Sequence, residues 1–243
     1  MDFKANWEIF LEDFIEAEGY KVCIKGLGIT FLVALLGLFI GIIIGTIIAV
    51  IKVLPSQSIG AKICRKICDV YVGFFRGTPI VVQLLLGYFV IPGLLGTSWD
   101  SVVVCVCVFG LNSGAYVSEI MRGGIQSVDV GQMEAGRALG LSFSTTMLKI
   151  VVPQAIKNIL PTLGNELIAL IKETSVVSFV GTMDLCRSFQ RIGDSSYRYV
   201  IPYLALAIIY IIIVVIFTLL IKLLEKYLHK SDRNPVRKKR AAA

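Results

Sequence analysis

The chain has 243 residues, of which 56% are hydrophobic and only 17% are charged. A soluble domain is usually about 45–50% apolar and about 25% charged. The excess lies in long uncharged runs, which exclude an ordinary soluble domain and predict an all-α integral membrane protein. The net charge of +7 does not indicate nucleic-acid binding, because the basic C-terminal segment is short and lacks interleaved aromatic residues.

Residues 1–25 are expected to form an extracytoplasmic or interfacial segment. Trp7, Phe10, Leu11 and Phe14 recur at roughly helical spacing, which predicts an amphipathic helix at the membrane surface. The segment is acidic and lacks the basic start of a secretory signal, so we do not expect it to be one.

Five hydrophobic segments are expected to cross the membrane, since about 20 apolar residues span the hydrocarbon core as a helix. Four of them carry no charge, whereas the fourth in chain order is interrupted by Glu166, Lys172 and Glu173. Together they predict one transmembrane domain over residues 26–224 and a basic tail over 225–243. The expected spans are 26–51, 77–99, 101–118, 158–181 and 199–221.

Two of these spans carry local signals. Gly37, Gly41 and Gly45 follow one another at four-residue spacing in the first span, which predicts a close-packing seam. Pro79 is expected in the first turn of the second span, where a helix tolerates proline.

The distribution of Lys and Arg predicts the orientation of the chain in the membrane. With the N-terminus outside and the C-terminus inside, 17 of these residues lie on the cytoplasmic side and 7 on the outer side. The tail would then face anionic lipid headgroups. The outer segment over 182–198 is expected to be a short helix or loop. The six cysteines are scattered and His229 is the only histidine, so we expect no metal site.

The polar stretch 131–153 separates two hydrophobic segments and would lie in the cytoplasm. Its pattern predicts a helix over 130–139, a left-handed turn at Gly140, and a second helix that begins at Ser142 and is stopped by Pro153. Glu134 and Arg137 are helical neighbours suited to an ion pair. The pattern fits either an amphipathic interfacial helix or a docking element for a cytoplasmic partner.

This stretch resembles the coupling loop of bacterial ABC importer permeases. The family motif is Glu-Ala-Ala, three residues, Gly, nine residues and Ile-x-Leu-Pro. The chain has Glu134-Ala135-Gly136, Gly140 and Ile150-Val151-Val152-Pro153 at the same spacing, with small apolar departures at Gly136 and Val152. Other stretches resemble the polar amino-acid branch of the family, namely Arg76 to Pro79, Gly110 to Tyr116, Glu119 to Arg122, Pro153 to Lys157, Gly164 to Glu166 and Lys172 to Ser175.

The resemblance implies a type I ABC importer transmembrane domain in the bacterial plasma (inner) membrane. It implies two cytoplasmic ATPase subunits, a second permease copy in a homodimer or heterodimer, and an extracytoplasmic solute-binding protein. The chain contains no Gly-Lys dipeptide and hence no phosphate-binding loop, so ATP and Mg would be held by the partner subunits and no cofactor by this chain. The implied ATPase-coupling residues are Glu134, Ala135, Arg137, Gly140 and Pro153.

Polar residues within the spans are candidates for a substrate pathway, because ionisable groups at membrane depth usually face a cavity. Glu166 is suited to bind an ammonium or a cationic side chain, and Asn165, Asn112, Tyr116 and Ser113 are hydrogen-bonding candidates. The alternative for the last three is contact between helices, with Gly110 and Gly114 as a packing interface.

The function predicted on these grounds is the permease subunit of an ATP-driven importer of polar amino acids of the arginine/lysine/histidine, glutamine or cystine type. A permease for another small solute, or a gradient-driven secondary transporter, remains the alternative. The sequence offers neither the inverted repeat of secondary transporters nor a catalytic constellation, so an enzyme is not expected.

Overall fold

The computed structural model describes residues 3–55 and 57–240, with side chains as far as residue 228, and every regular element in these ranges is a helix. The expected all-α class is confirmed. In chain order the elements are α1 (Phe3–Leu11), η1 (Glu12–Glu16), α2 (Gly19–Val53), α3 (Ile59–Gly77), α4 (Ile80–Leu85), η2 (Leu86–Val90), α5 (Ile91–Leu95), α6 (Ser101–Gln126), α7 (Val130–Ala138), α8 (Phe143–Thr146), η3 (Met147–Val151), α9 (Val152–Glu173), η4 (Thr174–Val180), α10 (Leu185–Ser196) and α11 (Val200–Arg240).

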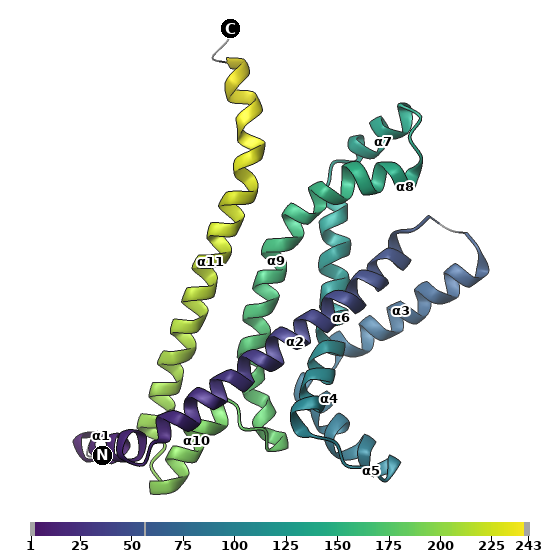
Figure 1. Cartoon of the computed structure of the whole chain (residues 1–243). Coiled ribbons are helices and arrows are strands. Elements are labelled where there is room, and N and C mark those ends of the chain that lie inside the picture. Colours follow the sequence, from purple (N-terminus) through teal and green to yellow (C-terminus); the bar gives the residue numbers. More distant parts are fainter. Residues whose placement is uncertain (1–2, 56, 241–243) are drawn as a thin grey trace.

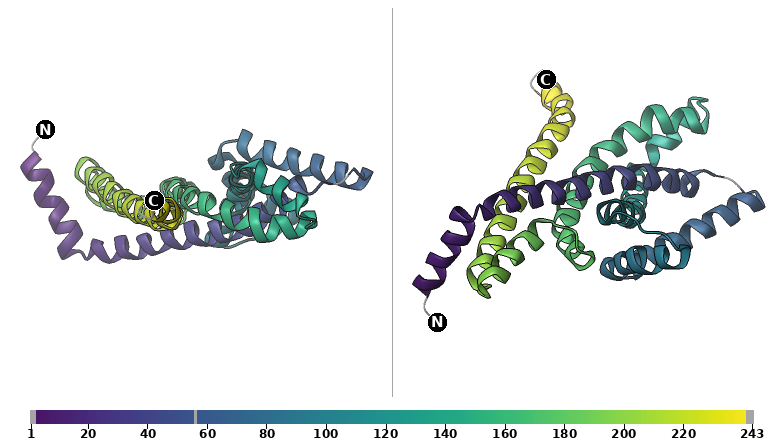
Figure 2. Two further views of the ribbon diagram at one scale, coloured as in Figure 1. Left: turned by 90° about the horizontal axis from the view of Figure 1, so that it is seen from above. Right: turned by 60° about the horizontal axis from the view of Figure 1, so that its bottom comes forward.

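The long helices run between two ends of an open, elongated molecule (Figure 1). The loop elements α7 and α8 and the C-terminal end of α11 lie at one end, whereas α1, α5 and α10 lie at the other. Seen from above, the helices form a shallow layer rather than a closed bundle (Figure 2). Long faces of α2 and α11 are therefore left uncovered by the rest of the chain.

Within the described residues, α2, α6 and the first part of α11 are long and apolar enough to cross a membrane, and the bent pair of α3 with α4 to α5 would make a fourth. The span expected at 158–181 corresponds to α9. This helix packs against both α6 and α11 but carries four charged residues, which keep it out of that count.

The second expected span, 77–99, contains the helical stretch Ile80–Leu95, which is set at an angle to the helix before it. The preceding segment 59–77 is itself the amphipathic helix α3, and the chain bends by 104° between α3 and the helical stretch Ile80–Leu95. Pro79 stands at the break, immediately before α4, instead of in its first turn. Proline has no backbone N–H, so it cannot donate the hydrogen bond that a continuous helix would require at this position.

Polar side chains satisfy the carbonyls that this break leaves open. The Thr78 hydroxyl donates to the carbonyl of Phe74 at 2.8 Å, and the Gln83 amide donates to the carbonyls of Phe75 at 2.9 Å and Thr78 at 3.0 Å. Asn112 of α6 donates to the Gln83 side chain at 3.0 Å. Non-helical backbone at membrane depth requires such partners, so these bonds hold the bend in place.

The predicted glycine seam of α2 packs against α6. A Cβ atom at Gly37 would lie 3.0 Å from Phe109 Cβ, one at Gly41 2.6 Å from Ser113 Oγ, and one at Gly45 2.7 Å from the backbone nitrogen of Ser118. The contact is reciprocal, since Gly110 and Gly114 of α6 face Ile40 and Ile44 of α2. Small residues let the two backbones approach closely, so α2 and α6 form the central pair of the fold.

The N-terminal segment is helical, as expected, and it packs on the protein. Phe10 stacks on Phe14 with ring centroids 5.3 Å apart, and Phe14 stacks on Phe189 of α10 at 6.3 Å. The segment 182–198, expected to be a short helix or loop, contains α10. Asp184 is buried and caps this helix by accepting hydrogen bonds from the backbone N–H groups of Cys186 and Arg187.

The loop 131–153 contains the predicted helix, turn and second helix, but Pro153 does not stop the second helix. Helical structure continues without a break from α8 through η3 into α9, with Pro153 in the first turn of α9. The π-helical turn η3 lies just before the proline, where the Val152 N–H donates to the carbonyl of Met147, five residues back. The wider turn accommodates the proline ring that a regular α-helix would exclude.

The predicted basic tail is helical as far as Arg240, because α11 continues into it.

Candidate translocation site and coupling loop

A serine–glutamate contact joins α6 to α9 in the middle of the fold. The hydroxyl of Ser113 donates to a carboxylate oxygen of Glu166 at 3.2 Å. Ser113 is fully buried, and the absence of a side chain at Gly41 leaves the space that its hydroxyl occupies. Glu166 is only half-buried and has no ion-pair partner among the described residues, so its second oxygen is available to a cation.

Asn112 lies away from this contact. Its amide is buried and donates to Gln83 at 3.0 Å and to the carbonyl of Phe75 at 3.2 Å, on the side of the helix break. Both of its donor hydrogens are thus used in holding helices together. The geometry favours the interhelical alternative for this residue over contact with a substrate.

Tyr116 faces a cavity of about 450 Å³ between α6 and α9, on the side toward the coupling loop. The guanidinium of Arg76, from the last turn of α3, lies 5.3 Å from the centre of the Tyr116 ring. Asn158 and Thr162 of α9 line the opposite wall. The cavity therefore combines one cation, the carboxylate of Glu119, an aromatic ring and neutral hydrogen-bonding groups.

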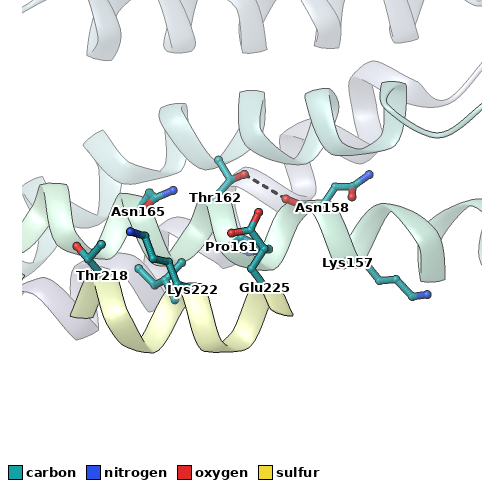
Figure 3. A pocket seen from close by; sticks show the side chains of 9 residues that line it. Lys157, Asn158, Pro161, Thr162, Asn165, Thr218, Lys222 and Glu225 are labelled. Carbon is teal, nitrogen blue, oxygen red and sulfur yellow. Dashed lines mark hydrogen bonds between the residues drawn. The ribbon is translucent and has the colours of Figure 1, made fainter. Parts of the chain in front are cut away.

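Asn165 points to a different side of α9 from its neighbour Glu166. It lines a second cavity, of about 350 Å³, between α9 and α11 (Figure 3). Thr218, Lys222 and Glu225 of α11 form the facing wall. The five pathway residues predicted from the sequence are thus divided among four places: the Ser113–Glu166 contact, the cavity beside Tyr116, the cavity beside Asn165, and the helix break that Asn112 contacts.

An ion-pair network ties α2, α3 and α6 together near the coupling-loop end. Arg122 donates to Glu119 at 2.6 Å, which is the i,i+3 pair that the sequence suggests. Lys52 of α2 adds to it, with its ammonium 3.2 Å from Glu119 and 2.8 Å from Asp69 of α3. Lys52 and Asp69 are far from this pair in the sequence and meet it only in the folded chain. The local sequence pattern therefore does not predict their contacts.

The turn in the coupling loop is held by a Schellman motif. Gly140 has φ of +81°, its N–H donates to the carbonyl of Arg137, and the N–H of Leu141 donates to the carbonyl of Gly136. The Arg137 guanidinium donates to the carbonyl of Leu141 at 2.8 Å. The Ser142 hydroxyl then accepts from the N–H of Thr145 and caps α8, as predicted.

The side chains of the loop divide into a packed side and an exposed side. Gly136 is buried against Thr146, and Met133 packs inward. Glu134, Ala135 and Arg137 are exposed, and no ion pair joins Glu134 to Arg137 in the described part of the chain. Ala138 and Leu139 are exposed as well, and Leu139 is 81% exposed.

The described residues contain no group of three or more His, Cys, Asp or Glu side chains arranged to hold a metal ion.

Comparison with known proteins identifies the family. Residues 26–230 match the family model of the binding-protein-dependent transport system inner membrane component, which covers most of the chain. The chain belongs to this family. It is a multi-pass inner membrane permease of an ABC importer. Members of this family are the permease component of such importers and not their catalytic subunit.

Similar proteins include three curated permeases. A putative glutamine transport system permease of Rickettsia bellii is 43% identical over 68% of this chain and 75% of its own length. The arginine transport system permease of Bacillus subtilis is 42% identical over 68% of this chain and 76% of its own length. An L-cystine transport system permease of the same organism is 36% identical over 70% of this chain and 74% of its own length.

Solved structures agree on the fold. An amino acid ABC transporter crystallised with histidines has a TM-score of 0.81 and 39% identity, with 87% of this chain and 96% of that chain covered. An inward-facing methionine ABC transporter has a TM-score of 0.72 over 85% of this chain and 96% of its own, and at 18% identity it supports the type I fold alone. As a member of this family, the permease works with an ATPase and with a binding protein.

Proposed function

We propose that this permease carries polar amino acids, of the kinds named for its relatives, into the cytoplasm. The observation that supports this cargo best is Glu166, a carboxylate within a membrane-embedded helix that is oriented by Ser113 at 3.2 Å. An amino acid brings an ammonium group that a carboxylate can bind, and an ionisable group at membrane depth indicates a transport pathway by default. The glutamine, arginine and cystine systems of the relatives all carry this class of substrate.

The polar side of α9 supports pairing with a second permease copy. Asn158, Thr162 and Asn165 are exposed along this helix at successive turns. Polar side chains at membrane depth do not face lipid, so this side requires either a protein partner or a water-filled pathway. We propose that it lines the space between two permease chains. A homodimer and a heterodimer with a related permease both satisfy this requirement.

The exposed side of the coupling loop supports docking on a cytoplasmic ATPase. Glu134, Ala135 and Arg137 are exposed, and the turn that carries Leu139 is fixed by the Schellman motif. We propose that each of two ATPase subunits, which hold the ATP and Mg, receives one such loop. Because α8, η3 and α9 form one continuous helix, movement of the loop is transmitted directly to the helix that carries Glu166. Pro153 lies within that connection.

Reconstitution in proteoliposomes with the cognate ATPase and binding protein tests the proposal. Uptake of glutamine, arginine or cystine should stop when ATP is depleted and survive an uncoupler. Uptake that needs only an ion gradient, or that purified chain alone catalyses, would establish a secondary transporter instead. Uptake of another solute with none of these amino acids would keep the ABC permease and overturn the proposed cargo.

Two variants separate coupling from cargo. Gly140→Pro removes the left-handed turn and should abolish co-purification of the ATPase. Glu166→Gln keeps the shape of the side chain and the bond to Ser113, but removes the charge, and should lower uptake by about tenfold or more, since a charged hydrogen bond contributes about 1.5–3 kcal/mol. ATPase binding should be unchanged in Glu166→Gln. Full uptake in this variant would contradict the role of the carboxylate.

A further inference from the structure

Arg76 is a cation placed at the helix break without a carboxylate partner. It belongs to the last turn of α3, two residues before the bend at Thr78, and it is exposed. The described part of the chain offers it no ion pair, and its guanidinium lies over the ring of Tyr116 at 5.3 Å. A stacked guanidinium keeps its hydrogen-bond donors free at the edge of the group, where a carboxylate can bind to two of them at once.

The charge around this guanidinium favours an anion. Glu119 lines the same cavity, but Lys52 and Arg122 already neutralise it, and Lys52 also binds Asp69. With Arg76, three cations therefore stand beside two carboxylates. The unbalanced positive charge is the one that faces the open space of about 450 Å³.

This cation lies one helical turn away from the carboxylate of the proposed pathway. Ser113, which binds Glu166, and Tyr116, which stacks on Arg76, are three residues apart on α6, which corresponds to a rise of about 4.5 Å. Thr162, on the cavity wall, is one turn from Glu166 on α9. Glu166 itself is not in the lining of the cavity. A negative and a positive group thus follow one another along the contact between α6 and α9, with the positive group nearer the coupling loop.

We propose that Arg76, positioned by Tyr116, binds the α-carboxylate of the transported amino acid while Glu166 binds its ammonium. This inference rests on the proposed function and adds a second subsite to it. The zwitterion is held with its carboxylate directed toward the coupling-loop end, and the polar cavity that continues past Thr162 to Asn158 and Ser127 provides its exit.

Direct binding to the purified permease–ATPase complex, without the binding protein, tests this subsite. The probes are L-glutamine and L-arginine, each compared with its amide, which lacks the negative charge of the carboxylate. The wild-type complex should bind each acid about tenfold more tightly than the amide, as one charge-assisted bidentate contact permits. Arg76→Gln should reduce this ratio to about twofold or less by weakening the acid alone.

Three further variants separate the subsite from a structural role. Glu166→Gln should weaken acid and amide alike and leave their ratio unchanged. Arg76→Lys keeps the charge but not the bidentate geometry, and should give an intermediate ratio. Lys66→Gln removes one charge from the exposed surface of the same helix, outside the cavity, and should behave as wild type.

Two results would overturn the inference. One is a wild-type complex that transports these amino acids but shows no preference for acid over amide. The other is an Arg76→Gln complex that loses thermal stability while keeping the wild-type ratio, which would assign Arg76 to the dipole at the end of α3. Both differ from failure of the proposed function, in which the wild-type complex transports none of the amino acids.

Discussion

Gly136 occupies the position where the coupling-loop motif carries its second alanine, and the structure gives the reason for the exchange. A Cβ atom at this position would lie 2.4 Å from Cγ2 of Thr146, and Thr146 is fully buried. Its hydroxyl donates to the carbonyl of Ser142 at 3.0 Å, so the side chain is held in place. The departure from the motif at Gly136 is thus a matter of local packing.

Gly136→Ala should therefore destabilise the loop by about 1–3 kcal/mol, the usual cost of overpacking. Thr146→Ser removes the methyl group and keeps the hydroxyl, so the double variant should recover most of the loss. The measurement is the thermal stability of the complex together with its ATPase activity stimulated by loaded binding protein. Gly73→Ala, with open space around the added methyl group, is the matched control. A double variant no better than Gly136→Ala would refute the packing account.

Asp184 gives the outer end of the permease a pH-dependent stability. Burial raises the pKa of its carboxyl to about 6, although the backbone N–H groups of Arg187 and Cys186 partly offset this effect. Because the pKa is higher in the folded than in the unfolded chain, the folded state prefers the protonated acid. Its contribution to stability is present below about pH 4 and is lost as the pH rises through 6.

Asp184→Asn should remove this dependence while keeping a side chain that caps α10. As the pH is raised from 4.5 to 7, the melting temperature of the wild type should fall relative to that of the variant. Thermal unfolding of the purified complex over this range measures the difference. Asp100→Asn, at the exposed start of α6, controls for removing a charge at a helix N-cap. Wild-type and Asp184→Asn curves that run parallel would show that the carboxyl does not titrate in this window.

At the scale of elements, the pair formed by α2 and α6 determines where the pathway residues stand. Gly41 leaves room for Ser113, which in turn orients Glu166 on α9. One position in the seam is therefore coupled to the charged group of the proposed pathway. This close packing leaves no room for an additional methyl group, because a Cβ atom at Gly41 would lie 3.1 Å from the backbone nitrogen of Gly114.

Gly41→Ala should lower the stability of the complex by about 1–3 kcal/mol and should also reduce amino-acid uptake, because it displaces Ser113. Gly28→Ala lies in the same helix with nothing within 4 Å of the new methyl group, and should not lose stability. The two variants are compared by melting temperature and by uptake in proteoliposomes. If both variants kept the same melting temperature and uptake, the seam would tolerate an additional methyl group, contrary to the short distances around Gly41.

Local sequence patterns predicted those elements whose cause is local. The glycine spacing of α2, the left-handed turn at Gly140 and the cap at Ser142 each depend on residues within a few positions of one another. The bend at Pro79 was not predicted, because the bonds that stabilise it come from Gln83 and from Asn112, 37 residues after Phe75. The prediction that Pro153 stops the second helix of the loop was also wrong, because the π-helical turn before it accommodates the proline ring.

The candidate site was predictable as a set of residue types but not as an arrangement. Ser113 and Glu166 were both candidates, yet their contact spans 53 positions of the chain, and nothing in the sequence distinguishes it from other possible pairs. Arg76 was assigned to the start of a span because the sequence does not show that the chain turns there and brings its guanidinium to Tyr116. Contacts between distant segments determine both features.

At the scale of the whole molecule, the two ends of the permease present different surfaces. The coupling-loop end exposes Leu139 beside the charged residues Glu134 and Arg137, whereas the opposite end exposes Leu94 of α5 (Figure 1). The two leucines are exposed to nearly the same extent, 81% and 82%. Only the coupling-loop end is proposed to dock on the ATPase, so the two ends should respond differently to the same substitution.

Leu139→Glu should reduce co-purification of the ATPase by about tenfold or more, because a charge placed in the apolar centre of a protein contact costs more than 2 kcal/mol. Leu94→Glu makes the same change at the other end and should leave the permease–ATPase complex intact. Both complexes are purified through a tag on the permease, and the bound ATPase is quantified against the permease. The melting temperature of the permease without ATPase verifies that both variants fold. If Leu139→Glu retains the ATPase, Leu139 lies outside the docking contact, and the exposed charged residues of α7 must carry it instead.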